Sequence, residues 1–350
     1  MRRKSFRDII KQENELVLKE NIDMNGLERT DWMYRKKWGV MIHQLEGMIN
    51  NGTHAKSLGK KTSWDEALRD FDHEHFAAQL HEAGAGWCLL TIMQCTKYMI
   101  APNETYDKIT GYKPGEACAS FDFIDEMYKA LSKYDIALML YFTGDGPRLD
   151  PVGAKAFGIT ADGRIHQMDY VEKWAAVARE YSLRYGNKIK GWWQDGMWKY
   201  FNDEEYRIFA EALRAGNSDA VLASNVFSCT DEYGVLLTQP RHAWTYDDYT
   251  AGEMIHLGAM PQLGAAITKG GRASRWHILS FLGVPSSLAD GYGEADGWGR
   301  PGSRYTPGWM YDYIDNVNKR GGIVTLDVCA YRNGTIDPDQ MRVLRVLKTV

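Results

Sequence analysis

The sequence lacks three features that would place it in well-defined classes of protein. Its longest apolar runs fall well short of the roughly 18 residues that cross a bilayer. Five cysteines are scattered over 350 residues and none belongs to a Cys-x-x-Cys pair, so we expect neither a zinc ribbon nor a disulfide framework. The 42 basic and 46 acidic residues leave a net charge of −4. Without a basic excess, we expect neither a nucleic acid nor a membrane as a partner.

Signatures of serine hydrolases and of cofactor binding are missing as well. No Gly-x-Ser-x-Gly motif is present to anchor an α/β-hydrolase triad. No glycine-rich phosphate loop follows the first predicted strand, which removes support for a dinucleotide-binding fold. His73, His75 and His81 share one predicted helix, but their spacing does not bring them to a single metal ion. We therefore predict no cofactor and no metal site.

Aromatic residues are plentiful, with 12 tryptophans and 20 tyrosines. Core packing accounts for part of this excess. Sugar-binding sites also collect aromatic side chains, because the faces of a pyranose ring are apolar and its edge is polar.

The chain begins MRRKSFRDIIK, which is basic but is not followed by the apolar segment of a signal peptide. We interpret residues 1–30 as a charged lead-in. The expected location is the cytoplasm, or a periplasmic or secreted location if a signal peptide has been removed.

Short apolar runs alternate with amphipathic segments along most of the chain. We predict strands at residues 39–43, 86–93, 137–142, 189–194, 221–226, 276–282 and 322–330. Helices are predicted at residues 72–83, 121–133, 170–185, 203–215, 309–319 and 338–348. Strands that alternate with helices of roughly ten to fifteen residues are typical of βαβ units and a parallel sheet.

This order predicts an α/β fold of the (β/α)8 TIM-barrel type, formed by residues 31–350 as a single domain. Six or seven strands are clear, and there is room for eight. The pattern blurs between residues 226 and 270, so we expect irregularity in the second half. A doubly wound sheet is the alternative, although the missing phosphate loop weakens it. We expect no C-terminal β-sandwich.

In a barrel, functional side chains gather where the strands end. Asp195 follows two tryptophans at the end of a predicted strand and precedes a glycine. A carboxylate in this setting is partly desolvated and rigidly held, which suits a nucleophile or a general acid or base. The residues alone equally allow a carboxylate that caps the next loop through local hydrogen bonds.

Several segments, taken in order, resemble one enzyme family. They are residues 38–43 (WGVMIH), 71–93, 136–143 (IALMLYFT), 191–196 (GWWQDG), 297–299 (GWG) and 319–338. Together they resemble glycoside hydrolase family 29, the α-L-fucosidases, across nearly the whole predicted barrel. The family's catalytic aspartate falls on Asp195. The resemblance implies a retaining, exo-acting hydrolase that removes a terminal α-L-fucosyl or related sugar from oligosaccharides through a covalent glycosyl-enzyme intermediate.

The acid/base of this mechanism is left open by the resemblance. In the family it is a carboxylate well downstream of the nucleophile, on a variable loop. Glu253 has a suitable separation from Asp195 along the chain, and Glu294 lies just before the Trp298 motif. We treat these two glutamates as equal candidates. Three aspartates remain possible behind them: Asp247, Asp248 and Asp290.

The resemblance also implies a sugar pocket. The family's first-strand histidine, which contacts the sugar, corresponds to His43. The expected sugar-binding set is His43, Gln44, Gln94, Tyr141, Trp193, Trp198 and Trp298. The tryptophans would pack against the sugar or its methyl group, and plain core packing is an equal alternative for each.

The sequence departs from the family where the sugar is recognised. The family's second strand ends in two adjacent histidines, whose places are taken by Gln94 and Cys95, and Gln44 replaces a tryptophan. The expected partner is therefore a glycoside or oligosaccharide whose sugar is fucose, another L-sugar, a uronate or a modified fucose. A catalytically inactive sugar-binding protein on the same barrel is the alternative function. A homo-oligomer remains open.

Overall fold

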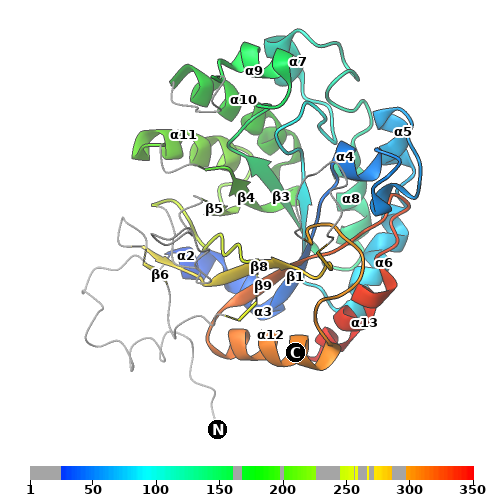
Figure 1. Cartoon of the computed structure of the whole chain (residues 1–350). Coiled ribbons are helices and arrows are strands. Elements are labelled where there is room, and N and C mark those ends of the chain that lie inside the picture. Colours follow the sequence, from blue (N-terminus) through cyan, green and yellow to red (C-terminus); the bar gives the residue numbers. More distant parts are fainter. Residues whose placement is uncertain are drawn as a thin grey trace, which may run out of the picture.

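The computed structural model describes residues 25–160, 168–197, 201–225, 245–255, 257–258, 266–267, 272–285 and 297–350. At its centre is one curled sheet of seven parallel strands, with helices along its outer side (Figure 1). In chain order the strands are β1 (Trp38–Ile42), β2 (Trp87–Thr91), β3 (Ala137–Thr143), β4 (Ile189–Asp195), β5 (Val221–Ser224), β8 (His277–Phe281) and β9 (Ile323–Asp327). β6 (Ala266–Ile267) and β7 (Ala273–Ser274) form a separate antiparallel pair. Each predicted strand is confirmed to within a few residues.

The described helices connect these strands or precede them. They are α2 (Asn25–Arg29), α3 (Asp31–Lys36), α4 (Glu46–Ile49), α5 (Trp64–Arg69), α6 (His73–Ala83), α7 (Glu104–Thr110), α8 (Phe123–Ser132), α9 (Pro151–Phe157), α10 (Met168–Tyr185), α11 (Asp203–Arg214), α12 (Pro307–Lys319) and α13 (Pro338–Val346), with single turns of 3-10 helix at η1 (Ala55–Ser57), η2 (Gly186–Lys188) and η3 (Leu347–Thr349). None of the helices in the described ranges is long and apolar enough to cross a membrane.

Helix α6 illustrates how local chemistry sets the helix ends. The Asp72 side chain accepts a hydrogen bond from the backbone N–H of His75 at 2.9 Å, which satisfies a donor that has no partner within the helix. At the other end, Gly84 has φ of 82°, a left-handed conformation that glycine adopts without steric cost. The helix predicted over residues 72–83 is confirmed, with Asp72 as its N-cap.

The strand order is β5-β4-β3-β2-β1-β9-β8. Each strand from β2 to β5 lies beside the strand that precedes it in the chain. On the other side of β1, β9 pairs with β1 and β8 pairs with β9, so the strands follow one another around the sheet in one direction. A doubly wound sheet reverses direction at a switch point. The doubly wound alternative is therefore wrong.

An irregular segment, residues 248–254, links the two edge strands of the sheet. The backbone N–H of Asp248 donates to the carbonyl of Leu222 on β5 at 2.8 Å, and the N–H of Met254 donates to the carbonyl of Leu279 on β8 at 2.8 Å. The expected eight-stranded barrel is thus supported as far as a curled sheet of seven parallel strands with helices. The expected irregularity in the second half is found in this segment.

The end of the curled sheet at which the strands begin is filled by α3. Met33 of this helix is fully buried among inward-facing side chains, Trp87 of β2 included. Arg275, also buried, holds the start of the helix through Thr30 Oγ1 (2.9 Å) and the carbonyl of Leu27 (3.1 Å). Because this end is packed, a pocket between the strands opens at their carboxyl ends.

Candidate active site

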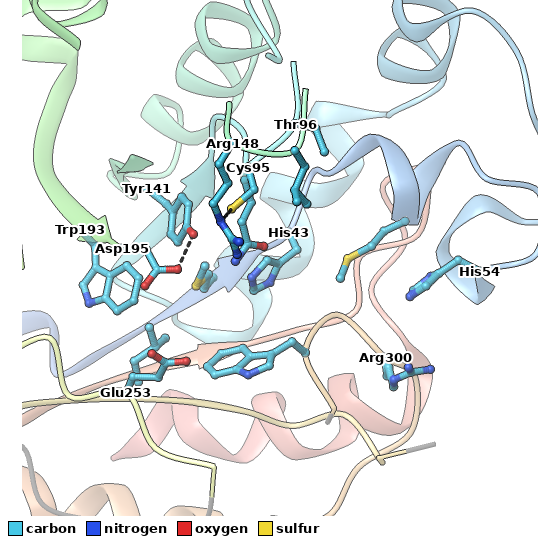
Figure 2. Close-up of a pocket in the computed structure, with 16 residues that line it drawn as sticks. His43, His54, Cys95, Thr96, Tyr141, Arg148, Trp193, Asp195, Glu253 and Arg300 are labelled. Atoms are coloured by element: carbon cyan, nitrogen blue, oxygen red, sulfur yellow. Dashed lines mark hydrogen bonds between the residues drawn. The ribbon is translucent and has the colours of Figure 1, made fainter. Parts of the chain in front are cut away.

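A pocket of about 520 Å³ lies at the carboxyl ends of the strands (Figure 2). Seven of the ten residues assigned to the site from the sequence line it together: His43, Gln94, Tyr141, Trp193, Asp195, Glu253 and Trp298. The rest of the lining was not predicted and consists of Met41, Met48, His54, Cys95, Thr96, Arg148, Leu149, Leu279 and Arg300.

Of the three other predicted site residues, the structure describes Gln44 alone, and Gln44 does not line the pocket. Gln44 is fully buried, its backbone N–H donates to Thr91 Oγ1 at 2.8 Å, and its side-chain amide has no hydrogen-bond partner among the described residues. His43 and Gln44 are neighbours at the end of an extended strand, so their side chains point to opposite sides, which puts Gln44 outside the pocket. Trp198 and Glu294 lie outside the described residues.

Asp195 is the last residue of β4, and its carboxylate is held on both oxygens. The Tyr141 hydroxyl donates to Oδ2 at 2.6 Å and the Asn225 amide donates to Oδ1 at 3.0 Å. Burial raises the pKa of Asp195 above its ordinary value, while the hydrogen bonds from Tyr141, Gly196 N–H and Asn225 and the charge of His43 act to lower it. Burial and the neighbouring carboxylate raise the pKa of Tyr141 well above its ordinary value, so Tyr141 remains a donor.

Glu253 stands close to Asp195, although it comes from the irregular segment that links β5 to β8. The same Asn225 amide nitrogen that donates to Asp195 also donates to Glu253 Oε2. The two nearest carboxylate oxygens are therefore no farther apart than two hydrogen-bond lengths, about 6 Å. Two carboxyl groups at this separation are suited to work on one substrate atom.

His43 follows β1 and is oriented by a carboxylate at the end of the neighbouring strand. Its Nδ1 lies 2.7 Å from Asp327 Oδ1, and the other Asp327 oxygen accepts the backbone N–H of Gly299 at 2.6 Å. An ionised carboxylate can only accept, so Nδ1 carries a hydrogen and Nε2 remains for a ligand. Lys56 is fully buried, and its ammonium group donates a hydrogen bond to the backbone carbonyl of His43. Burial lowers the pKa of this lysine.

A second wall of the pocket carries Cys95 and basic side chains. Arg148 Nε lies 3.3 Å from Cys95 Sγ and 3.4 Å from Asp145 Oδ2. Burial raises the pKa of the Cys95 thiol to about 12, so it is protonated and unreactive at neutral pH. Figure 2 shows Arg300 and His54 on the side of the pocket away from the two carboxylates.

The aromatic side chains of the pocket pack on one another as well as on its open space. Tyr141 and Trp193 stack with ring centroids 5.5 Å apart, and Trp193 Nε1 donates to the carbonyl of Ala251 at 3.0 Å. Trp298 meets His43 edge to face at 5.7 Å. Trp193 and Trp298 therefore line the pocket and also pack on neighbouring side chains, and their contact with a sugar stays a prediction.

The two alternative acids that the structure describes, Asp247 and Asp248, do not line the pocket. Asp248 is buried, receives hydrogen bonds from Arg214 and Arg272, and also accepts the backbone N–H of Leu222 at 3.0 Å. Asp247 accepts the Ser224 hydroxyl at 2.9 Å. Both aspartates stabilise the fold behind the site, and Asp290 lies outside the described residues. In the part of the chain that the structure describes, no group of three or more His, Cys, Asp or Glu residues is arranged to hold a metal ion.

Three residues that position the site were not among the assigned site residues: Asn225, Asp327 and Arg148. Asn225 and Asp327 carry a signal in the sequence, since they lie in the second halves of the predicted strands 221–226 and 322–330; in the structure Asn225 directly follows β5 and Asp327 ends β9. Arg148 has no such signal, because it belongs to a long loop whose path depends on its packing against Cys95.

No protein-family model matches the sequence, and no curated protein matches it. Solved structures do match. The chain shares its fold with fucose-active glycoside hydrolases. A variant of the endo-fucoidan hydrolase MfFcnA4 of glycoside hydrolase family 107 aligns with a TM-score of 0.66 and 16% identity, over 95% of this chain and 54% of that chain. The endo-fucoidan hydrolase P5AFcnA of the same family aligns with a TM-score of 0.64 and 17% identity, over 94% and 93% of the two chains. A family 29 α-L-fucosidase from Bacteroides thetaiotaomicron aligns with a TM-score of 0.59 and 16% identity, over 95% of this chain and 74% of that chain.

These likenesses concern the fold. The identities are low, and the chain spans about half the length of MfFcnA4. Because the similar structures come from families 107 and 29 alike, they support the fold of a fucose-related glycoside hydrolase and do not single out family 29, to which the sequence motifs pointed.

Proposed function

We propose that the protein is a retaining, exo-acting glycoside hydrolase that removes a terminal α-L-fucosyl or related sugar. The observation that carries the proposal is the pair of carboxylates, Asp195 and Glu253, joined by one amide group in the wall of a pocket. Retaining glycosidases need two carboxyl groups roughly 5–5.5 Å apart, and the bridged pair is compatible with this distance. The shared fold with fucose-active hydrolases supports fucose as the first sugar to test.

In the first step, Asp195 attacks the anomeric carbon while the glycosidic bond breaks and the leaving oxygen takes a proton from Glu253. This produces a glycosyl-enzyme ester and a free alcohol. In the second step, Glu253 as a carboxylate takes a proton from water, the water oxygen bonds to the anomeric carbon, and the bond to Asp195 breaks. The free sugar leaves and both carboxyl groups return to their starting states.

Glu253 is the better supported of the two acid/base candidates that the sequence left equal. It lines the same pocket as Asp195 and shares a hydrogen-bond donor with it. Around the sugar, the Nε2 atom of His43 would bond a hydroxyl group, and Trp193 and Trp298 would cover the ring. The volume of about 520 Å³ falls within the range usual for small-ligand sites.

The test combines turnover with covalent trapping. We expect the protein to hydrolyse one glycoside in a panel of nitrophenyl α-L-fucoside, other L- and D-glycosides and uronides. We expect Asp195→Asn to lower kcat by about 10⁴-fold or more without changing the unfolding temperature by more than a few degrees. A 2-fluoro-fucosyl fluoride, the reagent named for one of the similar structures, should add one sugar mass to the peptide that contains Asp195. Full activity of Asp195→Asn, or a label on another residue, would reject the assignment.

A sugar-binding protein without activity is the second candidate. The observation in its favour is the loss of the histidine pair, since Gln94 and a protonated Cys95 stand in its place. It predicts saturable sugar binding by calorimetry together with no turnover and no covalent label in the experiments above.

A further inference from the structure

Asn225 occupies a rigid position directly behind the two carboxylates. It follows β5, and its backbone is bonded in both directions: its N–H donates to the carbonyl of Gln194 at 2.7 Å, and its carbonyl accepts the N–H of Met197 at 2.9 Å. Its side chain is almost fully buried and is not part of the pocket lining. Asn225 therefore touches the proposed catalytic groups without touching the substrate.

The two neighbours of this side chain determine which way its amide points. Asp195 Oδ1 and Glu253 Oε2 both face the same terminal atom. An ionised Asp195 only accepts hydrogen bonds, and the carbonyl oxygen of a protonated Glu253 also accepts, so the terminal atom that faces both must be the NH2 group, which has one hydrogen for each oxygen. The amide carbonyl in that place would set three acceptors against one another.

We infer that Asn225 is a positioning residue that holds Asp195 and Glu253 as a matched pair, so that Asp195 stays an unprotonated nucleophile and Glu253 keeps its acidic proton on the oxygen away from it. This inference rests on the proposed function. Oε2 of Glu253 accepts the amide hydrogen, so the proton of the acid form sits on Oε1. The NH2 group between the carboxyl groups also prevents them from sharing one proton directly, as closely spaced carboxyl pairs otherwise do.

Several other groups face Asp195 from the elements packed around it. They are the Tyr141 hydroxyl on β3, the His43 imidazole after β1 and the Cys95 thiol after β2. Among the described residues, Asn225 is the one whose side chain has hydrogen bonds to both proposed catalytic carboxylates. Replacing it therefore changes the relation between the two groups, whereas replacing Tyr141 changes Asp195 alone.

The test uses two replacements at Asn225 and one at its neighbour. Asn225→Asp keeps the shape of the side chain but puts a third carboxylate against the pair, and Asn225→Ala removes the donor. Ser224→Ala is the matched control, because Ser224 is equally buried, precedes Asn225 and bonds to Gln194 and Asp247 on the other face of the sheet. All variants would be compared as full-length protein, with thermal unfolding to verify that they fold.

We expect both Asn225 variants to lose about 10²–10³-fold in kcat on a fucoside with a poor leaving group, with KM within about threefold. In Asn225→Asp, both limbs of the pH profile of kcat/KM should move to higher pH by about one unit, because a like charge raises the pKa of each neighbouring carboxyl. With a dinitrophenyl leaving group, which needs no protonation, the loss in Asn225→Ala should shrink at least about tenfold. Ser224→Ala should keep the wild-type profile.

Wild-type kcat and an unchanged pH profile in Asn225→Asp would overturn the inference while leaving the proposed function intact. If the wild type neither turns over nor takes a covalent label, the proposed function fails. The pairing is then tested directly by a carboxyl carbon-13 NMR titration of wild type and Asn225→Asp, with Asp195→Asn and Glu253→Gln used to assign the signals. A joint upward movement of both titrations supports the pairing, and unchanged titrations reject it. If Asn225→Ala does not fold, Asn225→Asp carries the test.

Discussion

Along the side of the pocket formed by β3, β4 and the residue after β5, oxygen and nitrogen atoms make short contacts. Asp195 accepts hydrogen bonds of 2.6 and 3.0 Å from Tyr141 and Asn225. On the neighbouring side, after β2, the contacts involve sulfur and are longer: Cys95 Sγ lies 3.3 Å from Arg148 Nε and 3.7 Å from Asp145 Oδ2. We call these the carboxylate wall and the sulfur wall.

The difference between the walls separates two tasks of the proposed enzyme. The carboxylate wall carries Asp195, which matches the catalytic aspartate of the resembled family, and short hydrogen bonds to its charged group fix it in position. The sulfur wall carries Cys95 in place of one of the family's histidines, and a protonated thiol is a weak hydrogen-bond donor. We therefore expect changes in the first wall to alter kcat and changes in the second to alter KM and the choice of sugar.

After Asp195→Asn, the largest effect is expected from Glu253→Gln in the carboxylate wall. Removal of the proposed acid should lower kcat by about 10²–10⁴-fold on glycosides with poor leaving groups. Steady-state kinetics over a series of leaving groups would measure this, with the dinitrophenyl glycoside as the internal control that needs no acid. A uniform loss across the series would exclude Glu253 as the acid and would point back to Glu294.

Tyr141→Phe should have a smaller effect than the replacements of Glu253 and Asn225. It removes a hydrogen bond to a charged group, which corresponds to about 10- to 100-fold in kcat. Since the Tyr141 bond lowers the pKa of Asp195, its loss raises that pKa, and the acidic limb of the kcat/KM profile should move to higher pH. A pH profile with both limbs in their wild-type positions would show that the bond does not tune the nucleophile.

On the sulfur wall, Arg148→Ala should raise KM about tenfold, the equivalent of roughly 1.4 kcal/mol of binding, with little change in kcat. Arg148 lines the pocket and its side chain is 39% exposed, so it is available to a bound sugar. Comparing KM for fucosides and uronides would show which sugar depends on it. A loss confined to kcat would contradict the division between the walls.

Cys95→Ala should have the smallest effect, less than about threefold in kcat/KM, because a thiol with a pKa of about 12 contributes only a weak donor. The matching measurement is thiol modification, which should be slow at neutral pH for the same reason. A large loss of activity would mean that Cys95 holds Arg148 in place and that the sulfur wall is also rigid.

The sequence predicted the regular part of the fold well. Strands such as residues 137–142 and helices such as residues 170–185 carry strong periodic patterns, because their burial repeats with the geometry of the element. The segment 248–254 has no such pattern. Its place is determined by backbone hydrogen bonds to β5 and β8, which are tertiary contacts that local sequence does not encode.

The candidate site also has residues that the sequence pointed to and residues that it could not place. Asp195 and His43 were found because strand ends meet at one edge of a parallel sheet. Gln44 was assigned to the pocket by its place beside His43, yet the alternation of an extended strand points its side chain elsewhere. Chain separation left Glu253 and Glu294 as equal candidates. The structure brings Glu253 close to Asp195 through an irregular segment whose path local sequence does not encode, and Glu294 lies outside the described residues.

The pairing of β1 with β9 joins two segments that are far apart in the sequence: Trp38 pairs with Val324 and Met41 pairs with Asp327. His43 and Asp327, which it brings together, are 284 residues apart in sequence. During synthesis, a nascent chain that ends before β9 already contains both proposed catalytic carboxylates and His43, but not the carboxylate that orients the imidazole. Contacts of such long range form late in folding. We expect the proposed activity to appear only after β9 has paired with β1, because Asp327 orients His43 through that pairing.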